Sequence, residues 1–286
     1  MEQIKIGTCI PGQQAEQWLP GMKDKGFECF AINFHMTYSG IDLKELAPKV
    51  MGMLEGTGTY VSTVGYYCNA LQNESQLHDL EYAIDNAHLF GAKTVATFAG
   101  ALEGQSIDAA IPRFKEVFSE LAKRAEDRGV KLAIENCPML FDAGQWPGGQ
   151  NLATTPKIWR EMFSRIPSEY FGLNYDPSHF VWQRVDYLKP LYEFKDKIFH
   201  VHYKDIKLYP DRLDDVGIMG YPLEYMAPKL PGLGDVDWGA YVSALRDIGY
   251  DGYTCVEVED RAFEGSLENV KKSLLLSKRY IEQFVI

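Results

Sequence analysis

The sequence predicts an α/β fold, a single (β/α)8 TIM barrel formed by residues 1–286. Eight short apolar runs rich in β-branched and aromatic residues recur along the chain, and segments with helical spacing separate them. Strands that are apolar on both faces and alternate with helices indicate a parallel sheet with right-handed crossovers. Eight such units in 286 residues fit a barrel, which typically uses about 250 residues.

The individual elements follow from these runs. The expected strands are 4–10, 29–34, 60–67, 94–100, 131–137, 171–177, 198–205 and 253–260. The clearest expected helices are 74–91, 107–129 and 267–285. Because glycine adopts the left-handed conformation that ends many helices, four glycines before strands predict helix ends: Gly26, Gly91, Gly129 and Gly249. Asp237 and Thr155, the latter ahead of Pro156, are predicted N-caps.

A doubly wound open sheet is the structural alternative. No GxGxxG or P-loop pattern follows any expected strand, so the usual signature of a nucleotide site is missing and the barrel is favoured. No linker or composition shift divides the chain. Two long connections, 138–155 and 206–236, are predicted to be lids, binding loops or subunit contacts.

Composition and charge restrict the partners. Hydrophobic residues make up 46% and charged residues 24% of the chain, as in ordinary globular proteins. A formal net charge of −11 opposes nucleic acid and anionic membrane surfaces, so we expect neither as a partner. No apolar run approaches the roughly 18–20 residues of a membrane span. A small-molecule substrate is expected, and the sequence leaves a homo-oligomer open.

The N-terminal stretch and the cysteines predict a cytoplasmic location. The first residues lack a basic start followed by an apolar core, so we expect no export signal. The five cysteines form no CxxC pair, and most lie in apolar runs, which is typical of buried free thiols in a reducing compartment.

Ionisable side chains collect where the last four expected strands end. These strands deliver Glu135, Asp176 with His179, His200 with His202, and finally Glu257 with Glu259. In a barrel the carboxyl ends of the strands form one rim, which carries the active site. Converging carboxylates repel one another and need a cation to be tolerated together. The pattern therefore predicts a metal site.

Each of these residues also has an ordinary structural explanation. Glu135 could pair with a Lys or Arg, and Asp176 before Pro177 could be a turn residue. Alternation points His200 and His202 to the same side, and two inward histidines are costly unless they are hydrogen-bonded or coordinating. Matched positions on four consecutive strands favour the metal site over four separate coincidences.

The predicted ligands are Glu135, Asp176, His202 and Glu257. This oxygen-rich set favours Mn²⁺ or Mg²⁺; we expect one Mn²⁺ ion, with Co²⁺ and Zn²⁺ as alternatives. His200 is expected beside the ligands, and Lys204 or Asp205 to orient a ligand or the substrate. Glu259 ranks below Glu257 as a ligand.

Five motifs, in this order, carry a resemblance to a known family: "AIEN", "DPSH", "HVHYKD", "PGLGDVDW" and "VEVED". Together they resemble the xylose isomerase-like TIM barrel superfamily, and most of all its sugar isomerases and epimerases of the ketose 3-epimerase and inosose isomerase type. The resemblance covers nearly the whole chain. It is specific for the superfamily and not for the substrate.

The resemblance implies roles for the same residues. In ketose 3-epimerases a metal is held at the positions that match Glu135, Asp176, His202 and Glu257, and the position of His179 contacts substrate. The residues matching Glu135 and Glu257 act there as acid and base on opposite faces of the sugar. Carried over, they would abstract a proton α to a metal-bound carbonyl through an enediolate, which the cation stabilises. Return of the proton gives an epimer or an isomer.

Two departures from the ketose 3-epimerase pattern keep other activities open. That family places an Arg and a further Glu where this chain has Leu208 and Phe141. The main alternative is a lyase acting on 3-keto-glycosides by β-elimination, since the large subunits of C-glycoside deglycosidases resemble this fold. An AP endonuclease would need additional histidines at the third and fourth strand ends, and a non-catalytic sugar-binding protein would exchange no carbon-bound proton.

Further substrate contacts are predicted at other strand ends. His35, Tyr67 and Asn69 end inner strands and are candidates for contacting the sugar. Trp146, in the first long connection, could form an aromatic wall of the binding site or pack as a plug beneath its loop.

Overall fold

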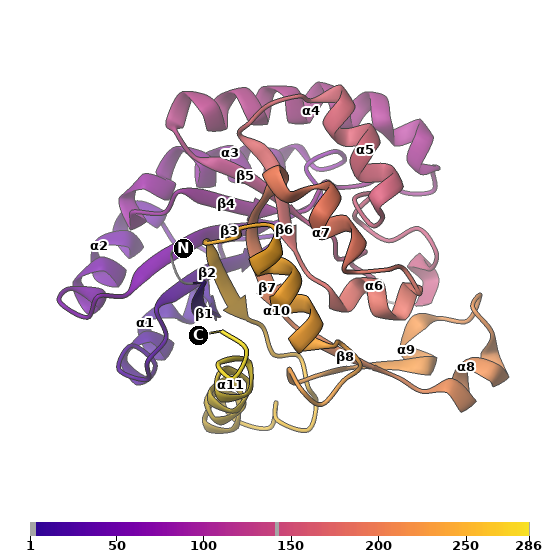
Figure 1. Cartoon of the computed structure of the whole chain (residues 1–286). Coiled ribbons are helices and arrows are strands. Elements are labelled where there is room, and N and C mark those ends of the chain that lie inside the picture. Colours follow the sequence, from indigo (N-terminus) through magenta and orange to yellow (C-terminus); the bar gives the residue numbers. More distant parts are fainter. Residues whose placement is uncertain (1–3, 141–142, 286) are drawn as a thin grey trace.

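Eight parallel strands close into a barrel at the centre of the molecule (Figure 1), in the order β1-β10-β7-β6-β5-β4-β3-β2. This computed structural model describes residues 4–140 and 143–285. The predicted (β/α)8 barrel is thereby confirmed. Its strands are β1 (Lys5–Pro11), β2 (Cys29–His35), β3 (Tyr60–Tyr67), β4 (Thr94–Thr97), β5 (Lys131–Glu135), β6 (Phe171–Tyr175), β7 (Ile198–Tyr203) and β10 (Tyr253–Val256).

Helices surround the barrel (Figure 1) and bury their apolar faces against it. In α4, for example, Phe114 and Phe118 each pack 6.0 Å from the ring of Phe171 in β6. The helices are α1 (Ala15–Trp18), α2 (Leu43–Leu54), α3 (Glu74–Asn86), α4 (Ile107–Arg128), α5 (Pro156–Arg165), α6 (Ser178–Gln183), α7 (Lys189–Glu193), α8 (Pro210–Val216), α9 (Pro222–Tyr225), α10 (Trp238–Asp247) and α11 (Leu267–Ile281). Among the described residues, none of them combines the length and apolarity that a bilayer span needs.

The predicted helix ends are largely correct. Asp237 accepts a hydrogen bond from the backbone N–H of Ala240 at 2.9 Å and so caps α10. Thr155 precedes α5 in extended backbone, but its side chain makes no capping bond, so the predicted cap is wrong in that respect. The four glycines predicted to end helices all have φ between 65° and 79°. Gly91, Gly129 and Gly249 follow helical segments, whereas the segment before Gly26 ends at Gly21 and continues as a turn, so the helix end predicted at Gly26 is wrong.

The predicted element bounds are too long in several places. α3 gives way after Asn86 to a 3-10 turn (Ala87–Phe90), β4 ends at Thr97, and α11 ends at Ile281. The largest correction concerns the strand predicted over 198–205. The barrel strand β7 ends at Tyr203, and Asp205 begins a separate strand, β8 (Asp205–Leu208), which pairs antiparallel with β9 (Met226–Lys229). This hairpin and the short helices α8 and α9 project from the barrel (Figure 1).

Asp205 anchors the loop that returns from this projection to the barrel. Five N–H groups donate to its fully buried carboxylate at 2.8–3.2 Å: those of Ile206, Gly232, Gly234, Val236 and the Trp238 indole. A side chain at Gly234 would place its Cβ 2.2 Å from Asp205 Oδ1, so the loop can approach this closely only with glycine there. The carboxylate is thus turned to the loop, away from the ligand-orienting role that the sequence suggests.

We expect Asp205→Ala to lower the free energy of unfolding by about 3 kcal/mol, because several buried N–H donors lose a charged acceptor together. Urea denaturation followed by circular dichroism measures the change. Asp214→Ala, at an exposed position of α8, is the matched control and should change stability by less than about 0.5 kcal/mol. Equal stability of the two variants would contradict the anchoring role of Asp205.

Candidate metal centre

Four adjacent barrel strands bring the predicted ligands together. Glu135 is the last residue of β5, Asp176 follows β6, His202 is in β7 and Glu257 follows β10. These strands are consecutive in the barrel, and parallel strands end at the same mouth. One ligand atom from each of the four residues lies within 4.8 Å of all the others. The structure therefore assembles the four side chains that the strand ends predict.

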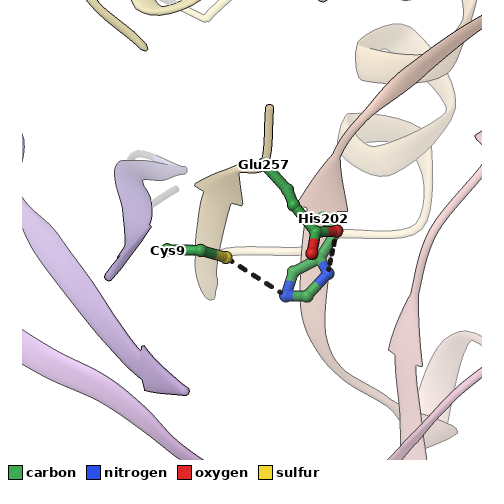
Figure 2. Close-up of side chains that lie close together, drawn as sticks. All are labelled: Cys9, His202 and Glu257. Carbon is green, nitrogen blue, oxygen red and sulfur yellow. Dashed lines mark hydrogen bonds and ion pairs between the residues drawn. The ribbon is translucent and has the colours of Figure 1, made fainter. Parts of the chain in front are cut away.

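His202 lies at the middle of this cluster and presents one ring nitrogen to it. Its Nδ1 is 3.2 Å from Glu257 Oε2 and 3.7 Å from Glu135 Oε2. Its Nε2 faces the other way, 3.1 Å from the Asn174 amide and 3.7 Å from Cys9 Sγ. Figure 2 shows Cys9 and Glu257 on opposite sides of the imidazole ring. The contacts at Nε2 fix the ring so that Nδ1 points at the carboxylates.

Asp176 and His179 form the second half of the cluster. His179 Nε2 lies 3.2 Å from Asp176 Oδ2 and 3.7 Å from Glu135 Oε1. The other oxygen of Asp176 accepts from the backbone N–H of Ser178 at 2.8 Å. The Asn136 side chain donates to the carbonyl of Asp176 and accepts from its N–H, at 2.8 and 2.9 Å. These two hydrogen bonds to the backbone set the position of Asp176 relative to β5.

The cluster is buried and rich in negative charge. Asp176 and His202 are fully buried, and Glu135 is 4% exposed. Lys204, 5% exposed, is 3.4 Å from Glu257 Oε2 and 2.8 Å from Glu259 Oε2. Burial raises the pKa of Glu257, but Lys204 and His202 outweigh it and hold that pKa well below its usual range. Burial lowers the pKa of His202, but Glu257 and Glu135 prevail and raise it to about 9.

Several buried polar atoms of the cluster fit a bound cation. Asp176 Oδ2, His202 Nδ1 and Glu257 Oε2 are buried and have no hydrogen-bond partner among the described residues. Buried polar atoms are otherwise nearly always hydrogen-bonded. All three point into the cluster, where a divalent ion would satisfy them and balance the carboxylate charge. The residues present therefore fit a metal ion held by carboxylates and one imidazole.

A cavity of ≈ 620 Å³ opens beside this centre. His179 and Lys204 line its polar side, and Trp182, Met139 and Met226 contribute apolar wall. Much of the remaining lining comes from α9, from β9 and from residues after β10. A volume of this size suits a small-molecule ligand.

Other predicted contacts lie at different depths. His200 is 1% exposed, and its two ring nitrogens face the Asn174 amide oxygen at 3.0 Å and Ser62 Oγ at 3.2 Å. It thus lies inside the barrel with its polar atoms engaged. Tyr67 lies beside the cluster, with its hydroxyl 3.1 Å from the Asn174 amide. Burial, and to a smaller extent the charge of Glu135, raises the pKa of Tyr67 well above its usual value.

Three predicted residues lie at the edges. His35 stacks on Tyr67 with ring centroids 5.0 Å apart and lines a smaller cavity of ≈ 250 Å³ together with Glu257. Asn69 is engaged by both backbone groups of Ala101 and lines a cavity separate from that of His179. Trp146 donates from its indole N–H to the carbonyl of Met219 at 3.0 Å, and so joins the two long connections.

Of the two positions that depart from the epimerase pattern, the structure describes one. Leu208 is the last residue of β8, and its N–H donates to Asp235. Phe141 lies outside the described residues.

Two residues that contact several groups of the site are not among the residues predicted from the sequence. Asn174 contacts His202, His200 and Tyr67 through one amide. Asn151 accepts from Ala99 N–H and donates to the carbonyls of Glu135 and Cys137. The position of Asn174 inside the buried strand β6 could have indicated its role in the site. The contacts of Asn151, by contrast, depend on how its loop folds back.

Comparisons with known proteins agree with the barrel fold. The family model described as "Xylose isomerase-like TIM barrel" matches residues 22–280. The chain is 26% identical over 210 residues to inosose dehydratase of Lacticaseibacillus casei, covering 69% of this chain and 67% of that protein. Other relatives, from Clostridium perfringens, are matched over about half of their length (52%).

Solved structures resemble the whole chain in fold. The 3-keto-D-glucoside 4-epimerase YcjR of E. coli superposes with a TM-score of 0.71 at 19% identity, covering 97% of this chain and all of that one. The IOLI protein with a bound zinc atom has a TM-score of 0.72 at 17% identity and covers 98% and 99% of the two chains. These likenesses show a shared fold, and the family match shows that the chain belongs to the xylose isomerase-like TIM barrel family.

Proposed function

We propose that this protein removes a proton from the carbon next to the carbonyl of a ketose or keto-sugar and returns it to give an epimer or isomer. The arrangement of Glu135 and Glu257 carries the proposal. In the barrel order, β6 and β7 lie between β5 and β10, so the two glutamates reach the cluster from its two sides. A base on one side and an acid on the other is what inversion at carbon requires.

Glu135, Asp176, His202 and Glu257 would hold one divalent cation. Such an ion would stabilise the negative charge that develops on the substrate oxygens. Three carboxylates with one imidazole favour Mn²⁺ among the candidates. The zinc atom of the IOLI structure makes Zn²⁺ the first alternative to test.

The chain's own side chains supply the proton transfer. Lys204 and His202 keep the Glu257 carboxylate ionised, which is the protonation state that a general base requires. Glu135, when it carries a proton, would return it from the opposite side. His179 Nε2 is buried without a hydrogen-bond partner among the described residues and borders the cavity, so it is placed to orient a substrate oxygen.

A lyase is the second candidate, and the inosose dehydratase relatives favour it. Loss of water or of an aglycone β to a ketone begins with the same removal of an α-proton. The apolar wall formed by Trp182 and Met226 could accept a group larger than a free sugar, as in a 3-keto-glycoside. The two outcomes differ after the first step: a lyase releases the β-substituent, whereas an epimerase keeps it.

We expect the protein to bind Mn²⁺ through Asp176. Asp176→Asn preserves the side-chain shape and the acceptor for Ser178 but removes the charge, so the dissociation constant for Mn²⁺ should rise at least about 100-fold. Electron paramagnetic resonance of free Mn²⁺ during titration measures it. Asp196→Asn, at an exposed position outside the site, is the control. Unchanged affinity in Asp176→Asn would rule out this ligand set.

We also expect the metal-loaded protein to incorporate solvent deuterium at carbon into a ketose or keto-glycoside. Glu257→Gln and Glu135→Gln should each slow the exchange about 10²–10⁴-fold, because general acid–base catalysis contributes that much. Mass spectrometry of free ketoses, ketose phosphates and 3-keto-glycosides incubated in D₂O detects exchange and eliminated products together.

The control for this experiment is Glu126→Gln on the exposed surface of α4, which should exchange at the wild-type rate. Metal content is measured for each variant, so that loss of the cation is distinguished from loss of the proton-transfer group. Full exchange by metal-stripped protein would refute the proposed function.

A further inference from the structure

A second group of metal-ligating atoms lies on the cavity side of Glu135. Glu135, Cys137 and His179 each offer one atom, and the three atoms lie within 4.8 Å of one another. Cys137 is half-buried and lines the ≈ 620 Å³ cavity together with His179. The group shares Glu135 with the four-residue cluster, and its His179 Nε2 lies 3.2 Å from Asp176 Oδ2 of that cluster.

The two oxygens of Glu135 face different histidines. Oε2 is directed at His202 Nδ1, and Oε1 is directed at His179 Nε2, both at 3.7 Å. A carboxylate in this orientation can give one oxygen to each of two cations. Glu135 is therefore oriented as a bridge between the four-residue cluster and the second group.

His179 supplies an independent indication of a ligand. Its side chain is more than nine-tenths buried, and Nε2 has no hydrogen-bond partner among the described residues. That nitrogen points at Glu135 and Asp176. A cation between ring and carboxylate would satisfy it, and the cavity gives such an ion an access route.

We propose that Glu135, Cys137 and His179 form a second site for a thiophilic divalent cation, Zn²⁺ in the first instance. Thiolate, imidazole and carboxylate are the three ligand types that zinc takes in proteins, and three protein ligands leave a position open toward the cavity. Mn²⁺ and Mg²⁺ prefer oxygen ligands, so the thiol separates the two sites by metal preference. Binding releases the thiol proton to solvent, since the thiolate is the ligand.

Occupation of this site has a consequence that rests on the proposed function. The ion would take up the Oε1 atom of Glu135 and a ring nitrogen of His179, the groups proposed to return a proton and to orient the substrate. Zinc at the second site should then inhibit a protein whose four-residue cluster holds Mn²⁺.

Titration of metal-free protein with Co²⁺ tests the site without any activity measurement. We expect two equivalents to bind, with a near-ultraviolet sulfur-to-cobalt charge-transfer band. Cys137→Ser should abolish the band and weaken one equivalent by at least about 100-fold, since loss of a ligand should cost no less than loss of its supporting contacts. His179→Gln should also lose one equivalent.

Cys68→Ser is the matched control, because Cys68 is a buried thiol that contacts the Gln76 carbonyl and the Thr97 hydroxyl and belongs to neither group of ligand atoms. It should keep both equivalents and the band. The equivalent that remains in Cys137→Ser shows that this variant is folded around its first site. A stoichiometry of one in the wild type, or a band that survives in Cys137→Ser, overturns the proposal.

The inhibitory consequence has its own readout. With Mn²⁺ bound, the zinc concentration that halves deuterium exchange should rise at least about 100-fold in Cys137→Ser, relative to that variant's own zinc-free rate. Equal zinc sensitivity of the two proteins would refute inhibition through this site. If no substrate exchanges at all, the proposed function fails, while the cobalt titration still decides whether the second site exists.

Discussion

The convergence of Glu135, Asp176 and Glu257 on one buried point is the constraint on which the rest of the site depends. Two like charges about 4 Å apart repel by about 4 kcal/mol at the effective dielectric constant of a protein site. Lys204 offsets part of this repulsion because its Nζ lies 3.4 Å from Glu257 Oε2, but the same ammonium group is also paired with Glu259. A multivalent cation would balance the remaining charge, and the buried atoms that make no hydrogen bond among the described residues point to where it would bind.

Neutral amides hold the charged groups in this unfavourable arrangement. Asn136 bonds to both backbone groups of Asp176, and Asn174 contacts the ring of His202. Asn151 accepts and donates at the end of β5. Because an amide both donates and accepts without titrating, it positions a ligand and adds no charge to the cluster. The geometry is thereby set by the frame before any ion binds, which is the preorganisation that catalysis by charge stabilisation needs.

The barrel and the four clustered side chains could be predicted from the sequence because both follow from strand periodicity. Parallel strands end at one rim, so a carboxylate or imidazole at four consecutive strand ends must converge. Alternation also points His200 inward, but its depth depends on strand stagger, and the β6–β7 register shifts between Leu173 and Asn174. The role of Asp205 could not be predicted, because the β8–β9 hairpin separates it in sequence from its partners at 232–238.

Under the proposed function, the proton transfer and the choice between products depend on different parts of this molecule. The groups proposed to transfer protons lie at the ends of barrel strands, where the closed sheet fixes them. The walls that would determine whether a β-substituent is held or released come from the projection around β8 and β9 and from the first long connection. Trp146 joins these two segments through its bond to Met219. Since the first step, α-proton removal, is common to epimerisation and elimination, changes confined to these walls could redirect the product while leaving the cluster intact.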